Sequence, residues 1–200
     1  MTQLLVIRHA ATDWNEAGLM QGRADRALSE AGRAWCRAVR LPAEWRVAQC
    51  LASPLSRAME TARLLGFDPT PEPRLVEMDW GDWEGQSLQA LRASQGDAMA
   101  RNEARGLDFR PTGGESPRDV QARLKPFLAA LAAPTIAVTH KGVLRALYAL
   151  ATGWDMKAKA PDKFLNGHAH AFSVTHGTPT VAALNIALTG REETGAETAQ

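Results

Sequence analysis

Short apolar runs that alternate with amphipathic stretches constrain the fold of this chain more than any other feature. Residues 4–7, 48–52 and 135–139 have the length and apolar character of buried strands. Amphipathic stretches of helical length follow these runs, and two more strands, 171–174 and 181–186, are expected at a sheet edge. Strands that alternate with helices predict an α/β domain with a largely parallel sheet.

Capping residues mark where several of the expected helices begin. Ser29 is expected to cap one helix, and Ser116, with an acidic Asp119 three positions later, is expected to cap another. Ser53 and Pro54 are typical of an N-cap and a first helical position, so we expect a third helix to begin there.

The length of 200 residues suits a single domain, which we place at residues 1–188. Residues 78–114 are rich in Trp, Gly and charged side chains and do not alternate cleanly. We expect them to form a variable excursion that covers one end of the sheet and the substrate. Residues 189–200 are polar and rich in Glu, and we expect a flexible tail there.

The charge balance and the cysteines limit the class of partner and the compartment. Lys plus Arg is 23 and Asp plus Glu is 22, so the net charge of +1 gives no global field for nucleic acid or an anionic membrane. No run approaches the roughly 20 apolar residues of a membrane span. The N-terminus lacks a signal peptide pattern, and Cys36 and Cys50 form no CxxC motif, so we expect free thiols in the cytoplasm.

Residues suited to anion binding follow three of the predicted strands. The first strand ends in Arg8 and His9, the second precedes a helix whose first turn holds Arg57, and the third ends in His140. Ligands of open α/β sheets bind beyond the carboxyl ends of the strands, where helix N-termini add positive dipole. If these strands are neighbours, two His and two Arg meet at one point, and paired arginines suit phosphate.

The remaining histidines cluster late in the chain, at His168, His170 and His176. A His-x-His pair can bind a metal, but no carboxylate or Cys stands at a supporting spacing. We expect these three to be surface or edge-strand residues, and we expect no metal site.

Taken in order, these residues resemble the histidine phosphatase superfamily, which has the phosphoglycerate mutase-like fold. Its opening motif runs Arg-His-Gly-Glu-Thr with an Asn a few residues later. The matching positions are residues 5–15, Gln21, Gly22, Asp25, Leu28, Ser29, Gly32, residues 52–58, Thr61, Ala62, Glu77, Gly81, residues 83–85, residues 113–116, residues 138–140, Gly142 and Arg145. The resemblance implies a three-layer sandwich whose mostly parallel central sheet has helices on both faces.

The resemblance also implies a role for each matching residue. His9 is expected to be the nucleophile that becomes phosphohistidine, and Glu77 the proton donor to the leaving group, with Glu84 as the rival for that role. Phosphoryl transfer needs charge neutralisation at the equatorial oxygens, which arginines supply without a metal or other cofactor. The residues expected to bind the phosphate or the rest of the substrate are Arg8, Asn15, Gln21, Gly22, Arg57, His140 and Lys141.

Three positions depart from the family pattern. Ala10 and Ala11 replace the usual Gly and Glu after the first His, and Lys141 replaces a Gly found in many relatives. Ala10 is expected to shrink the pocket by a methyl group, and the missing Glu removes a carboxylate near the site. Lys141 either touches substrate or points to solvent.

We therefore expect a metal-independent phosphomonoester hydrolase that acts on small phosphorylated metabolites, similar to the α-ribazole and broad-specificity phosphatases. The chain is short for a typical mutase, so its length favours hydrolysis. Two alternatives stay open: a mutase that uses a bisphosphorylated activator, and a non-catalytic phosphate-binding relative. A homodimer is compatible with the sequence, which does not determine the oligomeric state.

Overall fold

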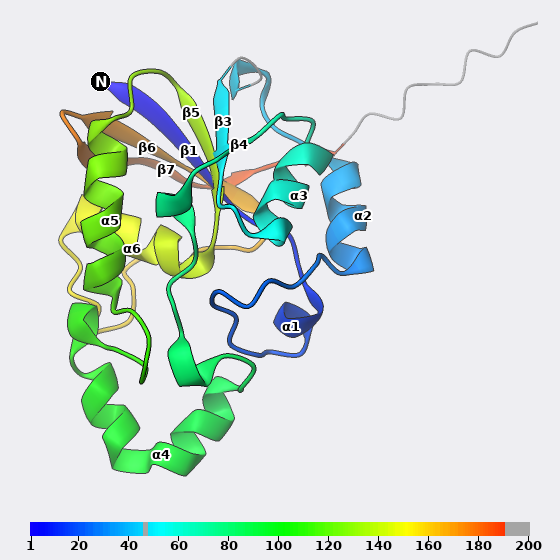
Figure 1. The fold of residues 1–200 in the computed structure, drawn as a ribbon. Helices are drawn as coiled ribbons and strands as arrows, with labels where there is room; N and C mark the ends of the chain where they lie inside the picture. The colour runs from blue at the N-terminus through cyan, green and yellow to red at the C-terminus, as the bar shows by residue number, and fades with distance from the viewer. Residues whose placement is uncertain (46–47, 191–200) are drawn as a thin grey trace, which may run out of the picture.

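A six-stranded sheet forms the centre of the computed structural model, which describes residues 1–45 and 48–190 (Figure 1). The strand order is β4-β3-β5-β1-β6-β7. Strands β4, β3, β5 and β1 are parallel to one another. Strand β6 pairs antiparallel with β1, and β7 pairs antiparallel with β6. The predicted mostly parallel α/β sheet is confirmed. The strands are β1 (Thr2–Arg8), β3 (Gln49–Ala52), β4 (Thr70–Pro71), β5 (Thr135–Thr139), β6 (His168–Thr175) and β7 (Thr178–Ala187).

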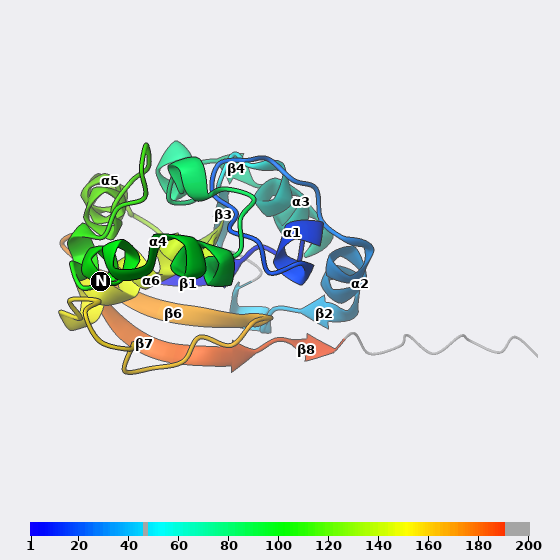
Figure 2. The same cartoon turned by 90° about the horizontal axis from the view of Figure 1, so that it is seen from below.

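Helices cover both faces of this sheet, as the resemblance implied (Figures 1 and 2). Along β1, Leu4 and Val6 face the cluster that includes α5 and α6, while Leu5 and Ile7 face the cluster that includes α3. This alternation follows from the two-residue period of a strand, and it gives the sheet two apolar faces. The helices are α1 (Asp13–Glu16), α2 (Glu30–Ala38), α3 (Ser56–Leu64), α4 (Leu88–Glu103), α5 (Pro117–Ala129) and α6 (Lys141–Thr152).

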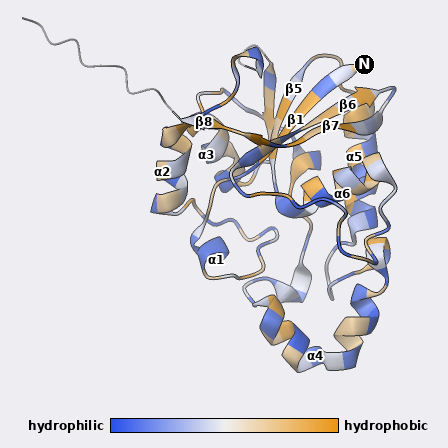
Figure 3. Ribbon diagram, turned by 180° about the vertical axis from the view of Figure 1, so that it is seen from behind, coloured by the Kyte–Doolittle hydropathy of each residue, from blue (hydrophilic) through white to orange (hydrophobic). Residues whose placement is uncertain are grey.

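Hydrophobic residues are concentrated in the strands of the central sheet, as Figure 3 shows by colour. All five residues of β5 are buried, which explains why its sequence reads as a continuous apolar and β-branched run. The short helix α1, by contrast, is hydrophilic and has no buried residue. The apolar strands form the buried centre of the fold. The polar segments beyond their carboxyl ends do not contribute to this core and can hold the residues of a binding site.

Two of the three predicted caps are confirmed and the third is wrong. The side chains of Ser29 and Ser116 accept hydrogen bonds from the first turns of α2 and α5, and Ser116 forms a capping box with Asp119. Helix α3 begins at Ser56 rather than at Pro54, and its N-cap residue makes no side-chain bond. Ser53 is engaged elsewhere, because its hydroxyl lies 2.7 Å from Nε2 of His140.

The region of residues 78–114 lies beyond the carboxyl ends of the parallel strands (Figure 1). It contains the 3₁₀ turns η3 (Gly81–Trp83) and η4 (Gly106–Asp108), with α4 between them. Helix α4 bends at Gly96, whose φ of +48° is open to glycine at little cost. We call this region the excursion; its role in covering substrate stays a prediction.

The end of the domain differs in part from the expected tail. Thr189 and Gly190 form β8, which pairs antiparallel with β2 (Val39–Arg40). Backbone pairing of this kind needs no apolar side chains, so the polar composition hid it. The rest of the expected tail, residues 191–200, lies outside the described residues, and the single-domain boundary at residue 188 stays a prediction.

The expectation for the late histidines is wrong for one of them. His176 is exposed and His168 is half-buried, but His170 is buried on β6, which has a strand on either side. Its Nδ1 accepts a 3.3 Å hydrogen bond from the Asn185 amide, and its ring meets the Phe164 ring at 5.3 Å. Within residues 1–45 and 48–190, no group of three or more His, Cys, Asp or Glu side chains is placed to hold a metal ion.

Candidate active site

The ends of three neighbouring strands bring the predicted site residues together. The amide of His9, just after β1, donates to the carbonyl of Thr139 at the end of β5 with a length of 2.8 Å. The rings of His9 and His140 lie 5.0 Å apart between centroids. Arg57, in the first turn of α3, donates from Nε to Nδ1 of His140 at 3.3 Å. Two histidines and an arginine, all buried, therefore share one small space.

The backbone fixes which nitrogen of His9 is free to react. Nδ1 lies 2.7 Å from the carbonyl oxygen of Ala10, and a carbonyl only accepts, so Nδ1 carries the proton. Nε2 then holds a lone pair. Burial lowers the pKa of His9 well below its ordinary value, and the charges of Arg8 and Arg57 lower it further. The imidazole is therefore neutral and nucleophilic at neutral pH.

His140 is oriented by the opposite arrangement. Its Nδ1 accepts from Arg57, so Nε2 carries the proton and donates to the Ser53 hydroxyl at 2.7 Å. Burial and then the neighbouring His9 and Arg57 lower the pKa of His140 well below its ordinary value. A neutral His140 has one N–H, which the Ser53 hydroxyl accepts here, so His140 would have to exchange this partner to donate to a phosphoryl oxygen.

Arg57 is fully buried and is held on several sides. Its terminal nitrogens donate to the carbonyls of Ala24 at 2.9 Å and Gly22 at 2.6 Å. Asp25, from the same loop, accepts from the amide and hydroxyl of Ser56 and so caps α3 from 31 residues away in the chain. The loop of residues 21–25 thus sets both the helix that carries Arg57 and the direction of its guanidinium.

Two buried donors near the site have no partner among the described residues: Nε of Arg8 and Nε2 of Gln21. Arg8 donates from another nitrogen to Oδ1 of Asn166 at 2.8 Å, and burial lowers its pKa. The carbonyl oxygen of Gln21 accepts from the hydroxyl of Thr12 at 2.8 Å, which leaves its amide group to donate elsewhere. Unpaired buried donors are costly, and an anion would satisfy them.

Glu77 is buried beside the start of α6. Its two carboxylate oxygens accept from the amides of Met78 at 2.8 Å and Gly142 at 3.1 Å. A Cβ on Gly142 would lie 2.5 Å from the carboxylate, so this approach requires glycine. Burial raises the pKa of Glu77, although the two amides and then Arg57 and Arg8 oppose the rise. A carboxyl of this kind can stay protonated long enough to act as an acid.

Glu84, the rival acid, has a different setting. Its carboxylate accepts from the amides of Arg23 at 2.5 Å and Ala24 at 2.8 Å. Both oxygens are therefore used to hold the loop of residues 21–25. Glu77 also accepts from two amides, so what favours it as the proton donor is its deeper burial and the charges of Arg57 and Arg8 near it.

The other predicted contacts fall around this centre. Asn15 forms a capping box with Thr12 at the start of α1 and donates to Gln21 at 3.4 Å, so its amide supports the loop. Gly22 contributes the carbonyl that Arg57 uses. Lys141, the first residue of α6, is exposed next to His140.

Ala10 and Ala11, which depart from the family pattern, both form hydrogen bonds through their backbone. The backbone amide of Ala10 donates to the hydroxyl of Thr61 at 3.0 Å. The Ala11 carbonyl accepts from the amide of Ser29 at 2.9 Å. Ala10 packs with Leu28 and Cys36. The site is therefore built without the carboxylate that the family pattern has at position 11.

Sequence reasoning assigned no role to Asp25 or Asn166. Asp25 was marked only by its place in the motif, which did not indicate that it caps α3. Asn166, 158 residues from Arg8, lies in a segment without a recognisable pattern, so no sequence signal indicated the contact.

Comparisons with known proteins show which proteins this chain is similar to in sequence and fold. The sequence pattern of the Histidine phosphatase superfamily (branch 1) matches residues 4–187. A 2,3-bisphosphoglycerate-dependent phosphoglycerate mutase of Methylobacterium radiotolerans is 31% identical over 96% of this chain and 93% of its own length. Phosphoserine phosphatase 1 of Hydrogenobacter thermophilus is 30% identical over 78% of this chain and 79% of its own. The structure of a mycobacterial glucosyl-3-phosphoglycerate phosphatase complexed with VO3 matches with a TM-score of 0.79 and 27% identity, covering 94% of this chain and 100% of that one.

Proposed function

The chain belongs to the histidine phosphatase superfamily, branch 1, and we therefore propose that it hydrolyses small phosphorylated metabolites through a phosphohistidine on His9. The family expected from the sequence is thus confirmed. The observation that carries the mechanism is the Nε2 lone pair of His9, left free by the bond from Nδ1 to Ala10 and flanked by buried Arg57 and His140.

The first half-reaction forms an N–P bond and breaks a P–O bond. Nε2 of His9 attacks phosphorus while Arg8, Arg57 and His140 hold the equatorial oxygens, whose charge they neutralise. Glu77 gives its proton to the departing alkoxide, so the leaving group departs as a neutral alcohol. The products of this step are phosphohistidine and a Glu77 carboxylate.

The second half-reaction restores the enzyme. A water molecule attacks the phosphohistidine, and the Glu77 carboxylate takes its proton as the new P–O bond forms. The N–P bond breaks, its electron pair returns to Nε2, and inorganic phosphate leaves. Apart from the substrate and this water, every group that these steps use comes from the chain itself.

Relatives of both kinds, hydrolases and mutases, are similar to this chain. Chain length does not separate the two activities, contrary to the expectation from the sequence, because the chain covers 93% of the mutase relative. We favour hydrolysis because two of the named relatives are phosphatases. By their names, these two act on phosphoserine and on a glycosylated phosphoglycerate.

The exposed ammonium of Lys141, beside the proposed phosphate pocket, suits an acidic group on the leaving alcohol.

A panel of phosphorylated metabolites, scored by release of inorganic phosphate in the presence of EDTA, tests the proposal. We expect release from at least one small phosphomonoester, with activity kept after chelation. If 3-phosphoglycerate with a trace of its 2,3-bisphosphate yields 2-phosphoglycerate without matching phosphate, the mutase reading holds instead. Absence of turnover on the whole panel would favour a non-catalytic phosphate-binding protein.

The cellular compartment and the oligomeric state are also proposals. Cys36 and Cys50 are free and buried, in keeping with a reducing cytoplasm. In the part of the chain that the structure describes, no helix is both long enough and apolar enough to cross a bilayer. A homodimer stays a proposal, to be tested by light scattering.

A further inference from the structure

The loop of residues 21–25 is hydrogen-bonded to α3 on one side. Arg57 donates to the carbonyls of Gly22 and Ala24, which stand directly before and after Arg23. A displacement of residue 23 would therefore move both acceptors of the guanidinium together. Both terminal nitrogens of Arg57 donate to this loop, so the loop helps to set the direction of the guanidinium.

The same loop is hydrogen-bonded to the excursion on its other side. The Glu84 carboxylate accepts from two consecutive loop amides, those of Arg23 and Ala24. Gly22 lies so close to the excursion that a Cβ there would be 2.9 Å from the amide of Trp80. The backbone of the loop is thus held between α3 and the excursion.

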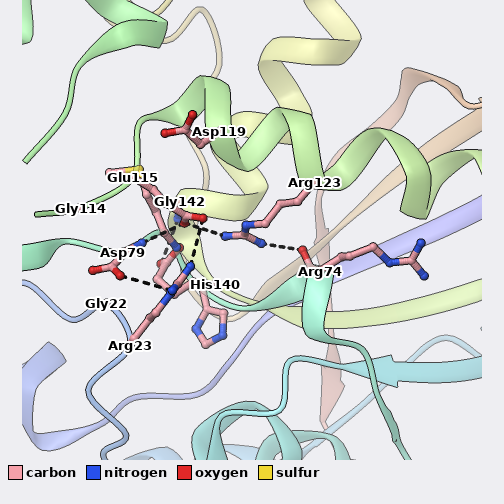
Figure 4. Close-up of polar contacts among 12 residues, drawn as sticks. Gly22, Arg23, Arg74, Asp79, Gly114, Glu115, Asp119, Arg123, His140 and Gly142 are labelled. Atoms are coloured by element: carbon pink, nitrogen blue, oxygen red, sulfur yellow. Dashed lines mark hydrogen bonds and ion pairs between the residues drawn. The ribbon is translucent and has the colours of Figure 1, made fainter.

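The side chain of Arg23 adds ion pairs as a third set of contacts that hold the loop (Figure 4). Its two terminal nitrogens form ion pairs with Oδ2 of Asp79 at 3.3 Å and Oε1 of Glu115 at 3.0 Å. The other oxygen of each carboxylate is already engaged: Oδ1 of Asp79 accepts from Gly81 at 2.9 Å, and Oε2 of Glu115 accepts from the Asp79 amide at 3.1 Å. Both carboxylates are therefore oriented toward Arg23 by their own backbone surroundings.

Arg123 extends this network to α5. It donates to Oε2 of Glu115 at 3.3 Å and to the carbonyl of Arg74 at 2.6 Å, so it spans the two as Figure 4 shows. An isolated exposed ion pair contributes little, because each side chain loses entropy and water screens the charges. Here Arg23 meets two carboxylates whose positions are set in advance, and the entropy lost on pairing falls mainly on Arg23.

We propose that Arg23 is a positioning residue for Arg57: by pairing with Asp79 and Glu115, it holds the loop of residues 21–25 so that the Arg57 guanidinium faces the phosphoryl group. The inference rests on the proposed function in assigning the phosphoryl group to Arg57. Arg23 itself acts through the two carbonyls beside it and touches no reacting atom.

The test compares Arg23→Ala with Arg118→Ala as a matched control. Arg118 is also half-exposed and pairs through two nitrogens with a carboxylate, Asp108, but this pair does not touch the loop of residues 21–25. Vanadate affinity is measured by calorimetry and kcat/KM with p-nitrophenyl phosphate. We expect Arg23→Ala to weaken both by about tenfold, as small misplacements of a charge clamp do, and Arg118→Ala to leave both unchanged.

The decisive arm repeats Arg23→Ala in an Arg57→Ala background. If Arg23 acts through Arg57, its loss there changes vanadate affinity by less than about twofold, because the two effects are not additive. An equal loss in both backgrounds, or a loss no greater than that of Arg118→Ala, overturns the proposal. Thermal unfolding identifies folded variants, and Arg23→Lys, which keeps one ion pair, replaces Arg23→Ala if the latter does not fold.

The vanadate arm also separates this inference from the proposed function. A wild-type protein that binds vanadate but releases phosphate from no ester would refute hydrolysis. The coupling between Arg23 and Arg57 would still be measured by calorimetry, and it would stand or fall on that result.

Discussion

Glu77 and Glu84 are carboxylates that each accept from two backbone amides, and their burial and their neighbours separate their proposed tasks. Glu77 is buried, and burial raises its pKa, so it can carry a proton to a leaving group. Glu84 uses both oxygens on the amides of Arg23 and Ala24. The pattern matches enzymes in which surroundings, rather than residue type, assign acid and positioning roles.

The leaving group tests this assignment. An alkoxide needs a proton as it departs, whereas p-nitrophenolate does not, so Glu77→Gln should lower kcat/KM on an alkyl phosphate by about 10²–10³-fold. The loss on p-nitrophenyl phosphate should be much smaller. Steady-state kinetics on the two substrates measure the difference, with Glu84→Gln as the control.

Equal losses on the two substrates for Glu77→Gln would assign it a positioning role. A leaving-group dependence that appears instead in Glu84→Gln would transfer the acid role to Glu84.

At the scale of helices and strands, α3 is capped by a residue from a distant loop. Its own N-cap residue, Leu55, has no side-chain oxygen, and Asp25 takes over by accepting from the Ser56 amide at 2.9 Å. Asp25 also places a negative charge at the positive end of the helix dipole. The cap and the Arg57 anchors come from the same loop, so stability and activity are expected to change together.

Removal of this cap should therefore have two effects. Asp25→Ala should lower the free energy of unfolding by about 1 kcal/mol, the usual cost of a lost N-cap, and should also lower kcat/KM. Asp25→Asn, which keeps one acceptor, should recover part of both. Urea denaturation and p-nitrophenyl phosphate kinetics measure the two quantities.

The control for this prediction is Asp13→Ala, which removes an exposed carboxylate paired with Arg26. A drop in stability without any change in activity for Asp25→Ala would contradict the link between the cap and Arg57.

The strands that carry His9 and His140 could be predicted from the sequence because burial on both faces leaves continuous apolar runs before each histidine. The start of α3 could not, because the Ser53 hydroxyl bonds His140 instead of a helix amide. Contacts between distant loops, such as that between Arg8 and Asn166, follow from the way the chain closes around the site. No local pattern encodes them.

Over the whole molecule, the buried histidines link stability to pH. Burial, with a smaller effect of His168, lowers the pKa of His170 from 6.5 to about 4. Between these values the unfolded chain binds more protons than the folded one, so stability rises with pH up to about 6.5 and is lost as pH falls toward 4. His9 and His140, whose pKa values are also lowered by burial, act in the same direction.

Equilibrium unfolding at pH values between 4 and 7 measures this dependence. The share of His170 should reach at most about 3 kcal/mol, from 1.36 kcal/mol per pKa unit. His170→Gln should flatten the profile by up to one proton, whereas His176→Gln, at an exposed position, should leave it unchanged. The same slope in both variants would show that His170 is not the source.

The central claim is that His9 carries the phosphoryl group, and rapid quench with ³²P-labelled substrate tests it most directly. Quenching in alkali, followed by peptide mapping, should trap a label that is stable in base, labile in acid and confined to the peptide that contains His9. His9→Ala should fold normally, take up no label and release no phosphate, because no other imidazole in the pocket has its Nε2 lone pair free. Label on another residue, or full turnover by His9→Ala, would contradict the account.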